Sequence, residues 1–376
     1  MRGALLFIAI FALSMLIIPM IALSYQSPPA TPPPIESILP IREPALQPDL
    51  EPQPDLYVGV TPPSGPPTFP VEIDLTPEQE GFPFAGVSTV SHFQILDERT
   101  GEIHIVSLRD YVRGAVVAEM PASFHPEALK AQAVAAHTFA LHHHLSQQSR
   151  PDPGLRGADF SADPQNRWGY MTEEMAMEFL GPHADEHWAR ITAAVDSVLH
   201  LIVKHDGEPI VAAYHAMSAG RTEYASNVWV GSAPYLIPAL SEGDLLAPGF
   251  ETHETRTADQ FRSAILAAHP EVTLSGEPVG WLDILELSSS GYVTGIQVGD
   301  TRLHGLDVRR ALYLRSHHFD VDYSSGNFTF TVRGYGHGVG LSQRGADFMA
   351  RQGYAFDEIL AHYYPGTGLY QVALFE

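Results

Sequence analysis

Residues 107–147 read SLRDYVRGAVVAEMPASFHPEALKAQAVAAHTFALHHHLSQ and predict a helix, a sharp break and a second helix. Ser107 with Asp110 three residues later is typical of a capped helix start. Pro121 ends the first helix, because proline disfavours helical geometry at the residue before it. Pro126 suits the first turn of the second helix, where its missing N–H costs nothing. We expect the rest of the chain to be organised around this pair of helices.

A single carboxylate, Glu119, lies at the break between the two predicted helices. If the first helix ends there, Glu119 lies at the negative end of the helix dipole, which disfavours the ionised carboxylate. A general acid must carry its proton near neutral pH, so this position favours such a role. The ordinary alternative is a solvated glutamate on a helix surface.

Composition excludes some classes of function. The formal net charge is −23, whereas nucleic-acid binding needs a basic footprint, so no nucleic-acid partner is expected. The chain has no cysteine and no HExxH motif, and three consecutive histidines on a helix, His142–His144, point in different directions. We therefore expect neither a metal nor another cofactor.

The first 26 residues predict a membrane anchor. Arg2 precedes an uncharged apolar run, Ala4–Leu23, that is long enough to span a bilayer as a helix. The rest of the chain is then expected outside the cytoplasm, in the periplasm or cell envelope. A signal peptide cleaved near Ala22–Tyr25 is the alternative and would give a secreted protein.

Residues 27–83 predict a disordered linker. The segment contains 17 prolines, nine acidic residues and one basic residue, Arg42. Such a composition cannot bury enough apolar surface to fold. It would act as a spacer between the anchor and a folded domain.

The folded part is predicted to span residues 84–376 and to be α+β. HFQIL and EIHIVSL alternate on either side of a turn and predict a hairpin. A second hairpin is expected from Leu199–Val203 and Ile210–His215, which flank the turn dipeptide Asp206-Gly207. Residues 245–330 predict an α+β lobe inserted between two motif blocks, in which Thr257 and Gln260 form a capping box.

The two flanking blocks are YHAMSAGRTEYASNVWVGSAPYL, residues 214–236, and GYGHGVGLSQRGADFMARQG, residues 334–353. Alternate glycines in the second block allow close backbone approach and positive φ angles. Together with VVAEMPASFHPEALKAQAVAAHTFAL, residues 116–141, these blocks closely resemble the SpoIID/LytB (stage II sporulation protein D) family. The resemblance covers most of residues 90–370.

The resemblance implies a SpoIID-like catalytic domain and a peptidoglycan lytic transglycosylase. Such an enzyme cleaves the bond between N-acetylmuramic acid and N-acetylglucosamine in glycan strands. The family glutamate, here Glu119, acts first as acid and then as base, leaving 1,6-anhydromuramyl ends. The alternative is a non-catalytic glycan-binding protein that enhances a cell-wall amidase, a role for which some relatives are named.

The resemblance also implies a set of substrate-binding residues. His137 stands where the family commonly has arginine and would titrate near neutral pH. Trp229 could stack on a sugar or pack in the core. Arg221 is the natural partner of an anionic group on the glycan. The full expected set is Gln132, His137, Ser218, Gly220, Arg221, Trp229, His337 and Gln343.

Overall fold

The computed structural model describes residues 90–164, 169–229, 231 and 233–373. All of them belong to one of the two compact units into which the chain divides, Pro40–Glu376. The predicted anchor (1–26) and the predicted linker (27–83) lie outside the described residues. Within the part that is described, no helix combines the length and the apolar character that crossing a membrane requires.

The predicted helix, break and helix are confirmed. The hydroxyl of Ser107 begins α2 (Leu108–Glu119) by accepting a hydrogen bond from the backbone N–H of Asp110 at 3.1 Å. The imidazole of His125 begins α3 (Pro126–Ser149), which has proline in its first turn as expected. Between the two helices the chain is extended at Met120, where φ is −122° and ψ is 140°.

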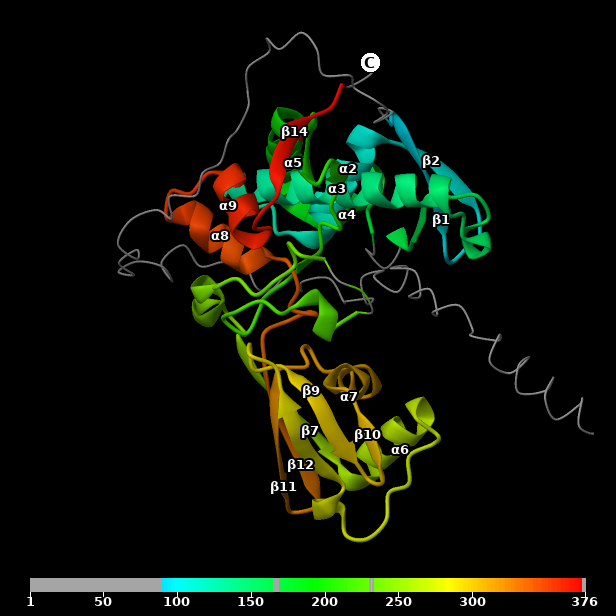
Figure 1. Cartoon of the computed structure of the whole chain (residues 1–376). Coiled ribbons are helices and arrows are strands. Elements are labelled where there is room, and N and C mark those ends of the chain that lie inside the picture. The colour runs from blue at the N-terminus through cyan, green and yellow to red at the C-terminus, as the bar shows by residue number, and fades with distance from the viewer. Residues whose placement is uncertain (1–89, 165–168, 230, 232, 374–376) are drawn as a thin grey trace, which may run out of the picture. The chain divides into compact units, whose positions relative to one another are not determined.

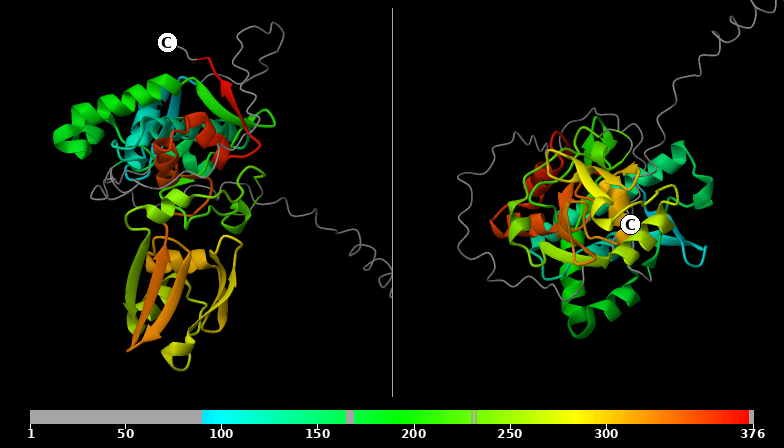
Figure 2. Two further views of the ribbon diagram at one scale, coloured as in Figure 1. Left: turned by 90° about the vertical axis from the view of Figure 1, so that its left-hand side faces the viewer. Right: turned by 90° about the horizontal axis from the view of Figure 1, so that it is seen from below.

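α3 lies at the centre of the helical part of the protein. Its packed stripe consists of Leu129 and three small residues, Ala133, Ala136 and Ala140, each at most 1% exposed, and the alanines allow neighbours to approach closely. α8 and α9, coloured red, lie beside the teal α3 in the ribbon views (Figures 1 and 2). The helices of this part, besides α2 and α3, are α4 (Glu173–Leu180), α5 (Ala184–Val198), α8 (Gln343–Arg351) and α9 (Phe356–Tyr363).

The first predicted hairpin is also confirmed. β1 (His92–Asp97) pairs antiparallel with β2 (Ile103–Ser107), with Leu96 opposite Ile103. β3 (Phe160–Ala162) adds a parallel strand on the other side of β1. The inner face of β1 contributes Phe93, whose ring meets the Tyr111 ring of α2 edge-on at 5.3 Å between centroids.

The second predicted hairpin forms only in part. β4 (Leu201–His205) turns through Asp206 and Gly207, both with positive φ, into a second strand of two residues, β5 (Glu208–Pro209). Ile210 still donates its backbone N–H to the carbonyl of Val203 at 3.1 Å. At the next residue the chain leaves this sheet, and the backbone N–H of Val211 donates to the hydroxyl of Tyr235 at 2.9 Å. The third strand of the sheet is instead β14 (Gly368–Gln371), and residues 214–215 form a separate strand, β6 (Tyr214–His215).

A separate α+β lobe lies between the two motif blocks, in the region predicted at about 245–330. Its two sheets have the strand orders β11-β12-β7 and β10-β9-β8. The Thr257–Gln260 capping box at its first helix is confirmed. The elements of the lobe are β7 (Glu251–Thr257), α6 (Ala258–Ala268), β8 (Leu282–Leu287), β9 (Val293–Val298), β10 (Thr301–Leu303), α7 (Gly305–Leu312), β11 (Phe319–Ser324) and β12 (Asn327–Arg333).

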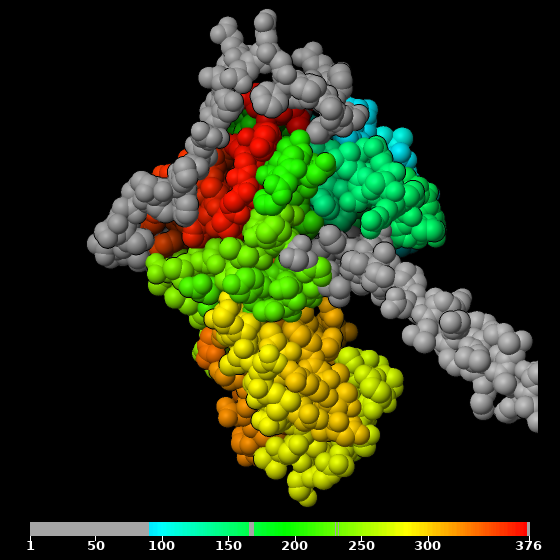
Figure 3. All heavy atoms as spheres, in the orientation of Figure 1, coloured from blue at the N-terminus to red at the C-terminus, as the bar shows by residue number. Residues whose placement is uncertain are grey.

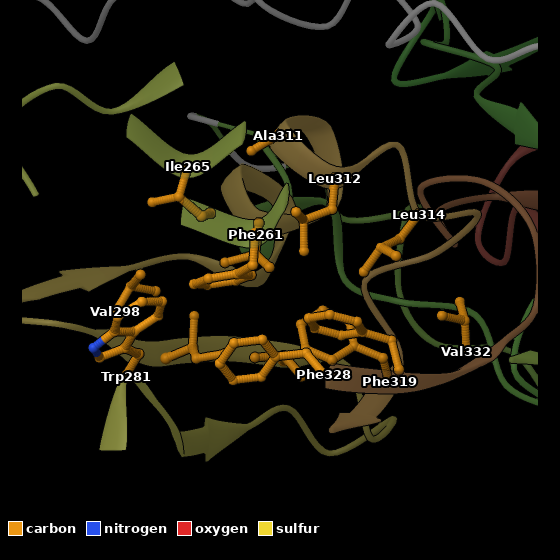
Figure 4. Packing of buried hydrophobic residues seen from close by; sticks show 14 of the residues in the cluster. Phe261, Ile265, Trp281, Val298, Ala311, Leu312, Leu314, Phe319, Phe328 and Val332 are labelled. Atoms are coloured by element: carbon orange, nitrogen blue, oxygen red, sulfur yellow. The ribbon is translucent and has the colours of Figure 1, made fainter. Parts of the chain in front are cut away.

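The lobe has an apolar core of its own. Phe261 of α6 points toward Phe328 of β12, with ring centroids 4.6 Å apart, and Trp281 packs next to both (Figure 4). Aliphatic side chains from β9 and α7 complete the cluster, Val298 and Leu312 among them. In the space-filling view the yellow and orange residues of the lobe form a continuous body (Figure 3).

Candidate active site

Glu119 is the last residue of α2, and its side chain is half-buried. Pro121 prevents the helix from continuing, so the carboxylate is presented at the helix end rather than on its flank. The side-chain amide of Gln343 donates a hydrogen bond to Oε2 of Glu119 at 3.1 Å. The first motif block and the last, 224 residues apart, therefore meet at this carboxylate.

One face of α8 holds the break that follows Glu119. Residues at intervals of four lie on one face of a helix, and Gln343, Asp347 and Arg351 have this spacing. The buried carboxylate of Asp347 accepts a hydrogen bond from the backbone N–H of His125 at 2.7 Å and another from Nε of Arg351 at 2.8 Å. The break is thus fixed at both of its ends by the same helix.

The charge of Glu119 affects the pKa of two tyrosines, Tyr111 and Tyr214. Burial raises the pKa of Tyr111 and of Tyr214, and the negative charge of Glu119 raises both further. Both phenols therefore stay neutral and protonated at physiological pH. They form part of a weakly solvated surrounding for the carboxylate.

The glycine-rich block fits tightly against the other motif block. β13 (Leu341–Ser342) pairs parallel with β6, with Leu341 opposite Tyr214. A Cβ atom at Gly340 would lie 2.0 Å from the carbonyl oxygen of Ala213, and one at Gly334 would lie 2.9 Å from that of Met217. Both glycines have positive φ. These two glycines therefore let the glycine-rich block pack directly against the backbone at Ala213 and Met217.

A buried carboxylate, Asp244, joins the two blocks at a second point. Its Oδ2 accepts hydrogen bonds from the backbone N–H and the hydroxyl of Ser218, at 2.8 and 2.6 Å. Its Oδ1 accepts from the hydroxyl of Ser342 at 2.8 Å. Burial raises the pKa of Asp244 to about 6, although the hydrogen bonds from Ser218 and Ser342 lower it. The Ser218 side chain is fully buried and engaged with this carboxylate.

His337 is buried in a group of rings behind the glycine-rich loop. Its Nδ1 accepts a hydrogen bond from the backbone N–H of Val339 at 3.0 Å. The Trp229 ring lies 4.8 Å from it and the His215 ring 5.5 Å, centroid to centroid. Burial lowers the pKa of His337 well below its usual value, so the ring is neutral at pH 7. The buried position of Trp229 agrees with the alternative of a packed core tryptophan.

The expectation that His137 titrates near neutral pH is wrong. His137 lies on α3 and is 3% exposed, and burial lowers its pKa to about 4. Gln132, on the same helix, is fully buried. An arginine at this position would keep its positive charge when buried, whereas the imidazole of His137 loses its proton and becomes neutral.

Arg221 and Gly220 lie at the more accessible end of the Ser218 loop. Arg221 is exposed, and its backbone forms an isolated bridge with Leu240. Gly220 has a φ of 94°, and a Cβ atom there would lie 2.7 Å from a methyl group of Leu245. Of the predicted polar set, Arg221 therefore presents its charge to solvent.

The sequence did not point to Asp244, Asp347 or Tyr214. Asp347 carried a usable signal, since it follows Gln343 by one helical turn and so shares its face. The other two carried none, because their partners are distant in sequence. Among the described residues, no group of three or more histidine, aspartate or glutamate side chains is arranged to hold a metal ion.

The chain is similar to several known proteins. The family model SpoIID, stage II sporulation protein, matches residues 97–205. Stage II sporulation protein D of Bacillus subtilis (strain 168) is 34% identical over 270 residues, which cover 72% of this chain and 76% of that protein. The protein of the same name from Bacillus amyloliquefaciens is 34% identical over 266 residues, 70% of this chain and 74% of that protein. A Bacillus subtilis (strain 168) protein named amidase enhancer is 26% identical over 309 residues, 69% of this chain and 40% of that protein.

A mixed α/β protein with one glutamate held at a helix break is the class that the fold and the site define. Given these identities, the chain belongs to the SpoIID family, which is related to the cell wall. The predicted family membership is thereby confirmed.

Proposed function

We propose that this protein is a peptidoglycan lytic transglycosylase with Glu119 as its catalytic residue. The observation that carries the proposal is the half-buried carboxyl of Glu119 at a helix end, held by Gln343 at 3.1 Å. A carboxyl fixed in this way can serve two successive proton transfers at one place.

In the proposed reaction, the Glu119 carboxyl gives its proton to the glycosidic oxygen as the bond from that oxygen to the muramyl C1 breaks. The resulting carboxylate then takes the proton of the muramyl 6-hydroxyl, whose oxygen bonds to C1. The products are a free N-acetylglucosamine hydroxyl end and a 1,6-anhydromuramyl end. No water and no second carboxylate take part, unlike in the glycosidases that use two carboxylates.

Mass spectrometry of digested glycan strands tests the proposal. Purified strands incubated with the protein should yield fragments whose muramyl ends are lighter, by one water, than hydrolysed ends. Hydrolysed ends of full mass would show a glycosidase instead. Intact strands would exclude both activities.

A second function is favoured by one relative, the protein named amidase enhancer. In that case the protein would bind glycan and increase the product of a cell-wall amidase without cleaving strands itself. Release of stem peptides by an added amidase, measured with and without this protein, distinguishes the two. Glu119→Gln would leave the enhancement intact, because binding does not need a proton donor.

We also propose that residues 4–23 anchor the protein to the cytoplasmic membrane, with the domain outside the cytoplasm. The apolar run preceded by Arg2 supports this location. N-terminal sequencing of the mature protein is the test. A mature chain that starts near Ser24 would show cleavage and secretion.

A further inference from the structure

The burial of the Asp244 carboxylate costs folding free energy. It is fully buried, and the hydrogen-bond donors that reach it among the described residues are neutral: the backbone N–H of Ser218 and the hydroxyls of Ser218, Ser241 and Ser342. Burying a carboxylate without a cation costs several kcal/mol, on the order of the whole stability margin of a domain. The turn at Glu242–Leu246 is already closed by backbone hydrogen bonds, from Asp244 N–H to the Ser241 carbonyl at 3.0 Å and from Ala247 N–H to the Asp244 carbonyl at 3.1 Å. The carboxylate therefore calls for a role beyond closing the turn.

The contacts of Asp244 lead directly to Glu119. Ser342 donates to Asp244 and, through the same oxygen, accepts from the backbone N–H of Gly345 at 3.3 Å, which caps α8. Gln343 is the next residue, and its amide donates to Glu119. Asp244 thus fixes the residue that precedes the partner of the proposed acid.

Building on the proposed function, we infer that Asp244 is a positioning residue for Glu119. It fixes the start of α8 through Ser342, so that Gln343 holds the carboxyl of Glu119 in one orientation. Through Ser218 the same group fixes the loop that carries Arg221. One buried carboxylate therefore sets the acid and the loop expected to bind the glycan in a constant relation.

A second helix in the same molecule shows that capping alone does not need this carboxylate. Thr257 caps α6 by accepting from the backbone N–H of Gln260 at 3.1 Å, and the Gln260 side chain completes the cap. The Thr257 cap relies on a neutral amide, whereas the Ser342 cap is tied to an aspartate from another segment. The difference fits a requirement for exact placement of α8.

Asp244→Asn alters the hydrogen bond between residue 244 and the Ser342 hydroxyl with little change in side-chain shape. If the asparagine oxygen keeps the Ser218 bonds, its NH2 group faces the Ser342 hydroxyl. That hydroxyl then has to accept and loses its donation to residue 244. Ser342→Ala removes the same hydrogen bond by deleting its donor, the Ser342 hydroxyl.

The test compares three variants of the full chain on purified glycan strands. Asp244→Asn and Ser342→Ala should lower kcat by roughly 10- to 100-fold, the effect of a slight misplacement of catalytic groups. KM should change far less, because both variants leave the Ser218 hydrogen bonds that hold the loop of Arg221 in place. Thr257→Ala, which removes the matched cap in the lobe, should keep wild-type kcat. Wild-type kcat in both Asp244→Asn and Ser342→Ala would overturn the inference, as would an equal loss in Thr257→Ala.

A measurement without substrate separates this inference from the proposed function. In the full chain labelled with ¹⁵N-glutamine, the side-chain amide of Gln343 is assigned by its disappearance in Gln343→Met. Asp244→Asn and Ser342→Ala should move this resonance toward its position in Glu119→Ala, where the acceptor is missing. Thr257→Ala should leave it in place. If the wild-type protein does not cleave glycan, the proposed function fails, and an unmoved Gln343 resonance in both site variants would overturn the positioning role as well.

Discussion

The lobe at residues 251–333 and the part of the molecule that carries Glu119 differ in the side chains that they bury. The lobe encloses aromatic and aliphatic side chains, with Phe261, Trp281 and Phe328 in mutual contact. The part that carries Glu119 also has an apolar core, with Val112, Phe124 and Leu129 fully buried, but it buries many polar groups as well. Gln132, His137, Ser218, Asp244, His337, Gln343 and Asp347 are all at most 3% exposed.

The difference teaches where each region gains its specificity. Apolar contacts stabilise a fold without fixing orientation, because they are non-directional. Buried hydrogen bonds contribute little net stability, yet they define one geometry, since an unmade bond in the interior is costly. Buried hydrogen bonds that connect to a single carboxylate are therefore the arrangement expected where orientation matters more than stability.

The largest effect is expected at Glu119 and would sharpen the contrast. Glu119→Gln keeps the shape and removes the proton donor, so cleavage should fall by about 10²–10⁴-fold while the melting temperature stays nearly unchanged. Initial rates on glycan strands and a thermal melt measure both. Glu174→Gln, an exposed change on α4, is the matched control. Turnover at the wild-type rate in Glu119→Gln would remove this residue from the mechanism.

A substitution in the apolar core of the lobe should lower stability and leave activity nearly unchanged. Phe328→Ala removes a ring that is 1% exposed, and the cavity should cost about 3–5 kcal/mol of unfolding free energy. The kcat measured well below the melting temperature should stay close to wild type, because this ring belongs to the core of the lobe. Tyr313→Ala, at a side chain 89% exposed, should change stability by less than about 0.5 kcal/mol. A larger loss of kcat than of stability in Phe328→Ala would contradict the contrast.

Asp347→Asn tests whether the break itself is held by α8. The asparagine cannot satisfy both the His125 N–H and Nε of Arg351, so the break should loosen and kcat should fall roughly 10-fold. Asp196→Asn is the control, because it disrupts a solvent-exposed pair with Arg109 at 2.6 Å, of a kind that contributes about 0–1 kcal/mol. Steady-state kinetics of the two variants side by side give the answer. Equal activities would mean that the break does not depend on Asp347.

The pH dependence of stability probes the buried carboxylate. Burial raises the pKa of Asp244 from 3.8 to about 6, so the folded state binds its proton more tightly than the unfolded state. This group's contribution to stability is present in full below pH 3.8 and is lost as pH rises through about 6. Urea unfolding between pH 4 and pH 7 should therefore show a smaller decline in Asp244→Asn than in the wild type. Parallel curves for the two proteins would refute this prediction.

The smallest effect is expected from a chelator. Cleavage should proceed at the same rate in EDTA, because the proposed chemistry needs only a carboxyl group. Rates before and after dialysis against EDTA measure this. Loss of activity that zinc restores, with magnesium as the control ion, would reveal a metal requirement.

The sequence by itself determined the local structure and the family. Ser107 and Pro126 specified helix starts, Pro121 specified a helix end, and Asp206-Gly207 specified a turn, because each acts on backbone within a few residues. The same reasoning placed Glu119 at the end of α2. Alternation of apolar residues was sufficient for the β1–β2 hairpin, whose two strands are joined by a short turn.

Tertiary structure alone decided which groups meet and which are buried. Gln343 reaches Glu119 across 224 residues, and Asp244 reaches Ser342 across 98, because packing brings α8 against the break and against the Ser218 loop. The same packing made His137 a neutral core residue and turned residues 214–215 away from the predicted hairpin to pair with β13. Local sequence carries no record of such partners, since hydrogen bonds and desolvation act between atoms that are close in space.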